Sequence, residues 1–229
     1  MRTRPGIILQ ARLASVRLPA KALAPVGGRT ILHRCISRLM SSGVGPVILA
    51  TTDGPEDDVL ALVASRLGAL VYRGDADDVL ARMCGAAEAY AIDPIVRATA
   101  DNPAVDPAAP GRLIEALGAG GADYAREDGL PIGAGVEAIT AAALRAMAGL
   151  ATSTYDREHV TTFIRTNAAS QRLRLLSPPA ALRQPWLRLT VDTADDLDWI
   201  RELFFRAGVD EPSVAQLITA ARQTMRQAA

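Results

Sequence analysis

The sequence predicts an α/β fold in which a mainly parallel sheet carries helices on both faces. Short apolar runs alternate with amphipathic helical segments through residue 103, an order typical of parallel sheets. Hydrophobic residues make up 49% of the chain and aromatic residues only 4%, as expected where aliphatic helices pack on a sheet. A chain of 229 residues can bury a substantial core, so we expect a single domain over residues 1–229.

Short apolar runs, bounded by Gly, Pro and polar residues, mark the strands. Buried parallel strands typically form such continuous runs. The first four predicted strands are 6–9, 46–50, 70–72 and 94–98. Four more are expected at 122–125, 136–139, 171–176 and 186–191.

Amphipathic helices are predicted between these strands, where apolar residues recur at helical spacing. Thr30 is the expected N-cap of the first helix, which leaves Arg34 and Arg38 on its outer face. The inward faces of the second and last helices include Val59 and Met225. The other helices are expected after Asp78, over 107–117, 140–149 and 155–167, and after Thr193.

Charged residues come directly after the first four predicted strands. They are Arg12 and Lys21, then Asp53, Arg73 and Asp101. Ligands of open parallel sheets bind outside the carboxyl ends of the strands, so these side chains are predicted to face one crevice.

The stretch 7–21, IILQARLASVRLPAK, leads from the first strand into a loop of small residues with three cations. These cations are Arg12, Arg17 and Lys21, and such a loop suits a polyphosphate ligand. A solvated basic turn explains the segment equally well when it is taken alone.

Asp75, Asp77 and Asp78 form an acidic cluster that suggests either a metal site or the first turn of a helix. We favour the helix start, because the helix dipole stabilises acidic residues there. Cys35 and Cys84 have no paired spacing and are interpreted as small hydrophobic residues.

Charge and hydropathy argue against two classes of protein. Lys plus Arg and Asp plus Glu both total 25, which gives no support for nucleic-acid binding driven by bulk charge. No apolar run approaches the roughly 20 residues of a membrane span, and the N-terminal apolar run is too short for a signal peptide. We therefore expect a cytoplasmic protein without a membrane segment.

Six segments together resemble a known family. They occur in order between residue 7 and about residue 204: IILQARLASVRLPAKAL, YRGDADDVLAR, IVRATADNPAVD, LPIGAGVE, REHVTTFI and RLTVDTADDLDWI. The set is similar to the cytidylyltransferases that make CMP-sugar acids, especially the SpsF-like spore-coat polysaccharide branch. The resemblance implies a Rossmann-like nucleotide-diphospho-sugar transferase fold. It also implies transfer of CMP from CTP to the hydroxyl of a sugar acid, sialic-acid-like or 3-deoxy-ulosonic, with release of pyrophosphate.

The resemblance also assigns residues to the nucleotide. By matching position, Arg12 and Lys21 are the catalytic cations that bind the triphosphate, with Ser15 and Arg17 beside them. Asp53, Arg73 and Arg82 are expected on the nucleotide side as well. Asp101 of ADNP and Asp192 of VDT match two acidic positions that bind Mg²⁺, a hard ion that prefers oxygen ligands.

On the acceptor side, Glu137 matches the last carboxylate of the family pattern Gly-x-Asp-x-Glu, but Gly135 stands where that pattern has Asp. Arg157 and His159 match the family's Arg-Glu-His segment, and they either contact the acceptor or belong to a structural ion-pair network. The alternatives are a phosphonate or sugar phosphate acceptor, and a non-catalytic CTP-binding relative. The family further implies a homodimer, with 140–185 as the dimerisation and acceptor-side extension.

Overall fold

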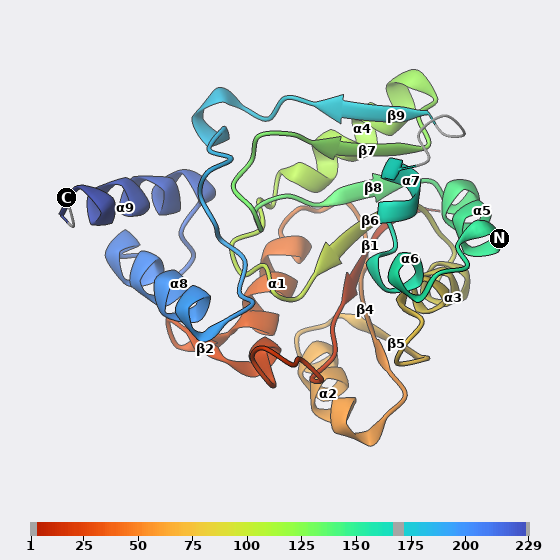
Figure 1. Ribbon diagram of the computed structural model, residues 1–229, viewed down its shortest axis with the longest axis horizontal. Helices are drawn as coiled ribbons and strands as arrows, with labels where there is room; N and C mark the ends of the chain where they lie inside the picture. Colours follow the sequence, from red (N-terminus) through yellow and green to blue (C-terminus); the bar gives the residue numbers. More distant parts are fainter. Residues whose placement is uncertain (1–3, 167–171, 228–229) are drawn as a thin grey trace.

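A seven-stranded sheet forms the centre of the computed structural model, which describes residues 4–166 and 172–227 (Figure 1). The strand order is β5-β4-β1-β6-β8-β7-β9, and only β8 runs antiparallel to its neighbours. The strands are β1 Arg4–Gln10, β4 Val47–Thr52, β5 Leu70–Gly74, β6 Ile92–Thr99, β7 Tyr124–Glu127, β8 Glu137–Ile139 and β9 Leu173–Leu176. A small antiparallel ribbon pairs β2 Pro25–Val26 with β3 Arg29–Thr30. The predicted mainly parallel sheet is confirmed.

Helices cover both faces of this sheet, also as predicted. One face packs on α1 Ile31–Met40, α2 Asp58–Arg66, α4 Ala109–Gly120, α8 Ala194–Ala207 and α9 Val214–Gln227. The other packs on α3 Val79–Ala89, α5 Ala141–Leu150 and α7 Thr162–Thr166, with α6 Thr154–His159 leading into α7. In Figure 1, α8 and α9 lie at the left, away from α3 and α5. None of the helices in the described ranges is long and apolar enough to cross a bilayer.

Alternating residues of β1 explain why its sequence is continuously apolar. Ile7 and Leu9 belong to the core cluster that includes α1, whereas Ile8 belongs to the cluster that includes α3. A strand covered on both faces needs apolar side chains at every position, because successive side chains point to opposite faces. The length of this run therefore reports burial on both sides of the sheet.

The predicted outer face of α1 is wrong, because Arg34 and Arg38 are buried. Arg34 is 0% exposed and donates to the backbone oxygens of Val26 (2.7 Å) and Asp210 (2.6 Å). Arg38 donates to the backbone oxygen of Pro212 (2.9 Å). The connection between α8 and α9 covers these side chains. Helical periodicity shows which face is apolar, but it does not show whether another element covers the polar face.

Two inward assignments are also wrong, since Val59 and Met225 are 38% and 51% exposed. Both lie on helices whose other apolar residues fill the core. Because Val59 and Met225 are apolar and occur at similar spacing, the sequence assigned them to the same buried face. Such single exposed apolar residues are ordinary on protein surfaces.

The predicted strand at 186–191 is wrong as well. Within the described residues, this segment makes only an isolated bridge, between Arg188 and Ile132. Leu187, Leu189 and Val191 are nevertheless buried in the core. Val191 N–H donates to the backbone oxygen of Asp101 (2.9 Å), so the segment runs past the end of β6. The alternating apolar residues of this segment are therefore buried in the core, although the segment does not pair as a strand of the sheet.

The predicted helix over 155–167 is two short helices, α6 and α7, separated by Val160 at φ +50°. Residues 167 and 171 of the predicted helix and strand lie outside the described residues. The extension expected at 140–185 contains α5, α6, α7 and the edge strand β9. Its part in a homodimer stays a prediction.

Candidate active site

The loop after β1 is fixed by a buried carboxylate, Asp57. Its Oδ1 accepts from the backbone N–H of Leu13 (2.8 Å). Its Oδ2 accepts from the hydroxyls of Thr51 (3.1 Å) and Thr52 (2.6 Å) at the end of β4. The small-residue loop is therefore held against the carboxyl end of the sheet, where its cations face a cleft.

This cleft, which we call the loop cleft, has a volume of about 460 Å³. It lies at the carboxyl ends of β1 and β6. The sequence predicted eight of its lining residues: Arg12, Ser15, Arg17, Lys21, Arg82, Asp101, His159 and Asp192. Residues far apart in the chain thus meet in one cavity, as the parallel sheet implied.

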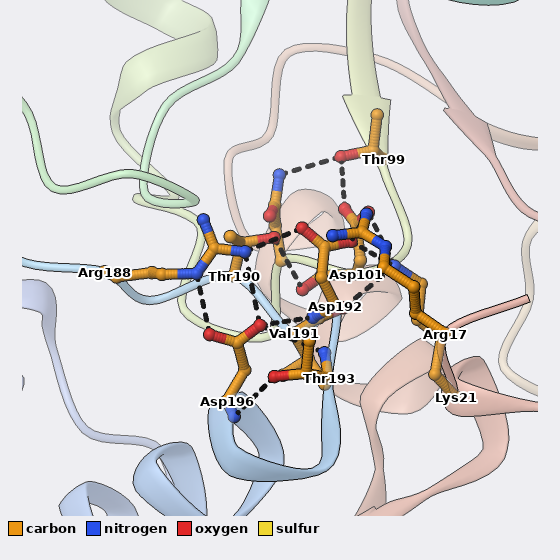
Figure 2. Close-up of polar contacts among 11 residues, drawn as sticks. Arg17, Lys21, Thr99, Asp101, Arg188, Thr190, Val191, Asp192, Thr193 and Asp196 are labelled. Carbon is orange, nitrogen blue, oxygen red and sulfur yellow. Dashed lines mark hydrogen bonds and ion pairs between the residues drawn. The ribbon is translucent and has the colours of Figure 1, made fainter. Parts of the chain in front are cut away.

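Lys21 reaches into the polar cluster of the loop cleft toward Asp101 and Asp192 (Figure 2). Its Nζ donates to Asp101 Oδ2 (3.1 Å), Asp192 Oδ1 (2.8 Å) and the backbone oxygen of Val191 (2.8 Å). One ammonium group therefore joins the two carboxylates that come from opposite halves of the sequence.

Both carboxylates are fixed by further partners (Figure 2). The hydroxyl of Thr99 donates to Asp101 Oδ1 (2.6 Å). Arg188 donates to Asp192 Oδ2 (2.7 Å), and Arg17 forms an ion pair with Asp192 Oδ1 (3.0 Å). Burial raises the pKa of Asp192, but hydrogen bonds from Lys21 and Arg188 outweigh it and hold the pKa below its usual range. Asp192 is therefore ionised at neutral pH.

Arg12 and Arg82 also line the loop cleft. Arg12 pairs with Glu158 (3.0 Å), and its Nη1 donates to the backbone oxygen of Ala76 (3.2 Å). Burial, followed by the charge of Arg12, lowers the pKa of Arg82. Two cations held this close favour an anionic ligand between them.

Of the acidic cluster 75–78, Asp78 is the N-cap of α3, whereas Asp75 and Asp77 precede the helix, so the favoured helix start is confirmed but the first-turn placement is not. Asp78 accepts from the backbone N–H of Ala81 (2.8 Å), and Asp75 accepts from the N–H groups of Asp77 and Asp78. No group of three or more potential metal-ligating side chains occurs in the described parts of the chain.

Asp53, Arg73 and Arg157 line neither this cleft nor the second one described below. Arg73 donates to the backbone oxygens of Thr52 (2.8 Å) and Gly54 (2.6 Å), and Arg157 donates to Asp78 (2.6 Å). Both arginines fasten loops at the edge of the site. Their contact with a ligand, like that of Asp53, stays a prediction.

A second cleft of about 520 Å³ lies beside the loop cleft. We call it the hairpin cleft, because the connection between β7 and β8 forms much of its wall. Arg97, Thr99 and His159 line both clefts. The two cavities therefore meet along β6 and α6.

Glu137 lines the hairpin cleft, but its oxygens are already engaged. Oε1 accepts from the hydroxyl of Tyr124. Oε2 accepts from Arg97 (2.6 Å) and from Thr161 (2.8 Å). Burial raises the pKa of Glu137, but the charge of Arg97 and these hydrogen bonds hold it below its usual range. The predicted contact of Glu137 with an acceptor is untested, and its observed contacts are with the protein.

The fold and this arrangement match known proteins. The family model described as cytidylyltransferase matches residues 6–224. The chain belongs to the cytidylyltransferase family. Spore coat polysaccharide biosynthesis protein SpsF from Bacillus subtilis (strain 168) is 35% identical over 219 residues, which cover 93% of this chain and 91% of that protein.

Other similar proteins support this assignment. The structure of a cytidylyltransferase from Leptospira borgpetersenii has a TM-score of 0.91 at 27% identity and covers 98% of this chain and 96% of that chain. The 3-deoxy-manno-octulosonate cytidylyltransferase of Rhodospirillum centenum is 32% identical over 123 residues, which cover 53% of this chain and 48% of that protein.

In this cytidylyltransferase, two glycines of the hairpin cleft differ in what they permit. Gly133 has φ +92°, and a Cβ there would lie 2.6 Å from the backbone nitrogen of Thr190. At Gly135 a Cβ would meet only Leu130 Cδ1, at 3.4 Å. Packing thus demands glycine at 133 but leaves room for a side chain at 135, the position where the family pattern has Asp.

Sequence reasoning missed three residues of this cytidylyltransferase site: Asp57, Arg97 and Arg188. Arg97 could have been recognised from the sequence, because a charged residue in the middle of a buried strand requires a partner. Asp57 and Arg188 carried none, since their partners come from other segments of the chain.

Proposed function

We propose that the enzyme transfers CMP from CTP to the hydroxyl of a sugar acid and releases pyrophosphate. One observation supports this most strongly. A cleft lined by the predicted triphosphate cations shares lining residues with a second cleft, in which Arg126 and Arg165 have no strong side-chain partner among the described residues. A nucleotide and an anionic acceptor can therefore lie side by side at the carboxyl end of β6. The SpsF relative suggests a role in surface polysaccharide synthesis.

The triphosphate would lie against Arg12, Arg17 and Lys21, with the Ser15 hydroxyl as a neutral donor. In the free enzyme each of these cations pairs with a carboxylate of the cleft. Phosphate oxygens replace those carboxylates as partners, so the cations are already positioned before the nucleotide binds. Fixed positive groups of this kind are the main source of catalysis in phosphoryl chemistry.

In the reaction, the acceptor hydroxyl oxygen forms a bond to the α-phosphorus of CTP. The bond from that phosphorus to the bridging oxygen breaks, and pyrophosphate leaves with its electron pair. The hydroxyl proton passes to solvent. Lys21 and Arg17 stabilise the negative charge that accumulates on the phosphoryl oxygens.

Asp101 and Asp192 are the residues that would hold Mg²⁺. Both place an oxygen on the same Lys21 ammonium, so a single cation can contact the two carboxylates. Two carboxylates without a third ligating side chain suit magnesium, which commonly takes its other ligands from substrate phosphates and water. When bound, the ion supplies further charge neutralisation at the α-phosphate.

Charge in the hairpin cleft favours an acidic acceptor. Arg126 reaches Asp128 only at 3.7 Å, and the side chain of Arg165 makes no hydrogen bond or ion pair with any described residue. The buried carboxylate of Glu127 is already bound by Arg112 (2.6 Å). The cleft therefore offers cations, while its buried carboxylates Glu127 and Glu137 are already bound within the protein and its third carboxylate, Asp128, is exposed.

A phosphonate or sugar phosphate acceptor is the second candidate. Gly135 favours it, because the family carboxylate that would repel a doubly charged group is missing there. The same arginines bind phosphate well.

An acceptor screen tests the proposal. The enzyme is incubated with CTP, MgCl₂ and one of four compounds: 3-deoxy-manno-octulosonate, N-acetylneuraminate, a sugar 1-phosphate or an alkylphosphonate. Pyrophosphate release and the mass of the conjugate are measured. We expect turnover with a sugar acid and loss of turnover in Asp101→Asn. Turnover restricted to the phosphate or phosphonate would establish the second candidate instead.

We also propose that the enzyme is a homodimer that uses the extension 140–185. The edge position of β9 and its exposed Leu175 support this. Sedimentation velocity of the wild type and of Leu175→Lys tests it, and a wild-type monomer at micromolar concentration would refute it.

A further inference from the structure

Arg188 bridges two carboxylates near the start of α8 (Figure 2). Its Nη2 donates to Asp192 Oδ2 (2.7 Å). Its Nε donates to Asp196 Oδ1 (2.7 Å), and Nη2 also donates to Asp196 Oδ2 (3.2 Å). Arg188 itself lines neither cleft, whereas Asp192 lines the loop cleft. Any effect of Arg188 on the site therefore passes through Asp192.

The orientation of Arg188 is fixed by its backbone as well as by its side chain. Its backbone oxygen accepts from Trp199 Nε1 of α8 (3.1 Å). Its partner Asp196 is fixed too, because Asp196 Oδ2 accepts from the backbone N–H groups of Asp192 (2.9 Å) and Thr193 (3.0 Å). The guanidinium group is therefore held against Asp192 before any ligand binds.

The two oxygens of Asp192 have different kinds of partner. Oδ1 contacts Lys21 (2.8 Å) and Arg17 (3.0 Å), which both line the loop cleft. Oδ2 is bound by Arg188. In the proposed reaction the triphosphate takes over Lys21 and Arg17, whereas Arg188 stays on Oδ2 because it lines neither cleft. Only Oδ1 is then open to a metal ion.

Magnesium and calcium differ in how they use a carboxylate. Mg²⁺ demands near-ideal octahedral geometry and usually takes one or two carboxylates together with substrate phosphates and water. Ca²⁺ is larger, accepts more oxygen ligands and can take both oxygens of one carboxylate. A carboxylate with one oxygen already bound by an arginine therefore suits Mg²⁺ better than Ca²⁺.

We propose that Arg188 is a positioning residue that makes Asp192 a one-oxygen ligand and so selects Mg²⁺ over Ca²⁺. This inference rests on the proposed function, to which it adds the choice of metal ion. Asp101 presents one oxygen in a similar way, because the hydroxyl of Thr99 binds its Oδ1 (2.6 Å) and leaves Oδ2 to Lys21. Arg188 differs from Thr99 in carrying a charge, so it also offsets the charge of Asp192 once Lys21 binds the triphosphate.

The experiment measures CTP binding with each ion in the absence of an acceptor, so that it requires no turnover. Calorimetric titrations give the dissociation constant of CTP in MgCl₂ and in CaCl₂, each at a concentration that saturates CTP. We expect the wild type to bind the Mg²⁺ complex about tenfold more tightly than the Ca²⁺ complex, the scale of one charged hydrogen bond. Arg188→Met keeps the apolar stem but frees Asp192 Oδ2. It should lose most of this preference, because the Ca²⁺ complex binds more tightly.

Two further variants separate the choice of metal from a structural role. Arg188→Lys keeps the positive charge but lacks the planar fork that holds two carboxylates, so its preference should lie between those of the wild type and Arg188→Met. Arg29→Ala is the matched control, because Arg29 also bridges two carboxylates, those of Asp210 and Glu211. The side chain of Arg29 is 36% exposed, against 40% for Arg188, and it lines neither cleft. Arg29→Ala should keep the full preference.

If Arg188→Met does not fold, the comparison of Arg188→Lys with the wild type carries the test, with an expected loss of about twofold or more in the preference. An equal change in both dissociation constants, with the preference retained, would overturn the inference and leave the proposed function intact. A wild type that binds CTP equally well with either ion would overturn it too. If neither ion strengthened CTP binding relative to EDTA, the metal site of the proposed function would itself fail.

Discussion

The loop cleft and the hairpin cleft meet along β6 but treat charge in opposite ways. In the loop cleft, cations and carboxylates pair with each other across the cavity, as in the contacts of Lys21 with Asp101 and Asp192. In the hairpin cleft, the carboxylates Glu127 and Glu137 are bound within the protein, and the side chains of Arg126 and Arg165 lack strong partners in the part of the chain that the structure describes.

This difference separates two ways of preparing a site for an anion. The loop cleft exchanges internal ion pairs for phosphate contacts, so its charges are fixed in place before the ligand arrives. The hairpin cleft leaves two arginines, Arg126 and Arg165, without strong side-chain partners among the described residues and therefore attracts anions of several kinds. Nucleotide binding should be specific and sensitive to each loop residue, whereas acceptor choice should respond to small changes in local charge.

The largest effect should follow loss of a carboxylate in the loop cleft. Asp101→Asn keeps the shape of the side chain but removes the charge proposed to hold Mg²⁺. We expect kcat to fall by about 10²- to 10³-fold, the range seen for loss of one preorganised electrostatic contact. Initial rates of pyrophosphate release measure it, with the exposed Asp198→Asn as control. A fall below tenfold would remove Asp101 from the metal site.

Substitutions of the two partners of the Arg12–Glu158 ion pair should change the affinity for CTP in opposite directions. Arg12→Ala should weaken binding by about 10- to 100-fold, because a charged hydrogen bond to phosphate is lost. Glu158→Gln should leave binding unchanged or tighten it up to about threefold, since the competing carboxylate is removed. Calorimetric titration with CTP and Mg²⁺ measures both. Tenfold weaker binding in Glu158→Gln would mean that Glu158 orients Arg12 instead of competing for it.

A smaller effect is expected from a charge added to the hairpin cleft. Gly135→Asp has room for its Cβ and places a carboxylate beside the arginines. KM for an acidic acceptor should rise by roughly fivefold, on the scale of one unit charge at a partly exposed site, and KM for CTP should not change. Gly135→Asn controls for size. A lower KM for the acid would indicate that this carboxylate binds the acceptor, as the family pattern suggests.

The smallest effect concerns stability beneath the loop cleft. Burial raises the pKa of Asp196, but hydrogen bonds from Arg188 and from the N–H groups of Asp192 and Thr193 lower it to about 2. A depressed pKa means that ionised Asp196 stabilises the fold above its ordinary pKa and that this contribution disappears as pH falls toward 2. Asp196→Asn should cost about 1 kcal/mol at pH 7, typical of a lost cap contact, and much less at pH 2.5.

Urea unfolding of the wild type and Asp196→Asn at both pH values measures this difference. An equal cost at pH 7 and pH 2.5 would show that the charge of Asp196 contributes nothing.

The sequence predicted most of the fold and most of the charged side chains of the loop cleft. Apolar runs such as 6–9 identify strands buried on both faces, and parallel strands bring their carboxyl ends together. Arg12, Lys21 and Asp101 could therefore be placed in one cavity without coordinates. Asp53 directly follows β4 and Arg73 lies within β5, and neither side chain lines the cleft.

The hairpin cleft was predicted less well, because the partners of its charged side chains come from distant parts of the sequence. Nothing in the sequence around Glu137 shows that Tyr124, Arg97 and Thr161 bind both of its oxygens. The hydrophobic spacing within α1 likewise could not show that the connection between α8 and α9 buries Arg34. The homodimer, the magnesium ion and the cytoplasmic location stay predictions.

A calorimetric titration with CTP and Mg²⁺, comparing Arg12→Ala with Arg126→Ala, tests most directly the claim that the two clefts hold different substrates. The account predicts that Arg12→Ala raises the dissociation constant of CTP at least tenfold, whereas Arg126→Ala stays within twofold of the wild type. Equal weakening by both variants, or weakening by Arg126→Ala alone, would contradict it.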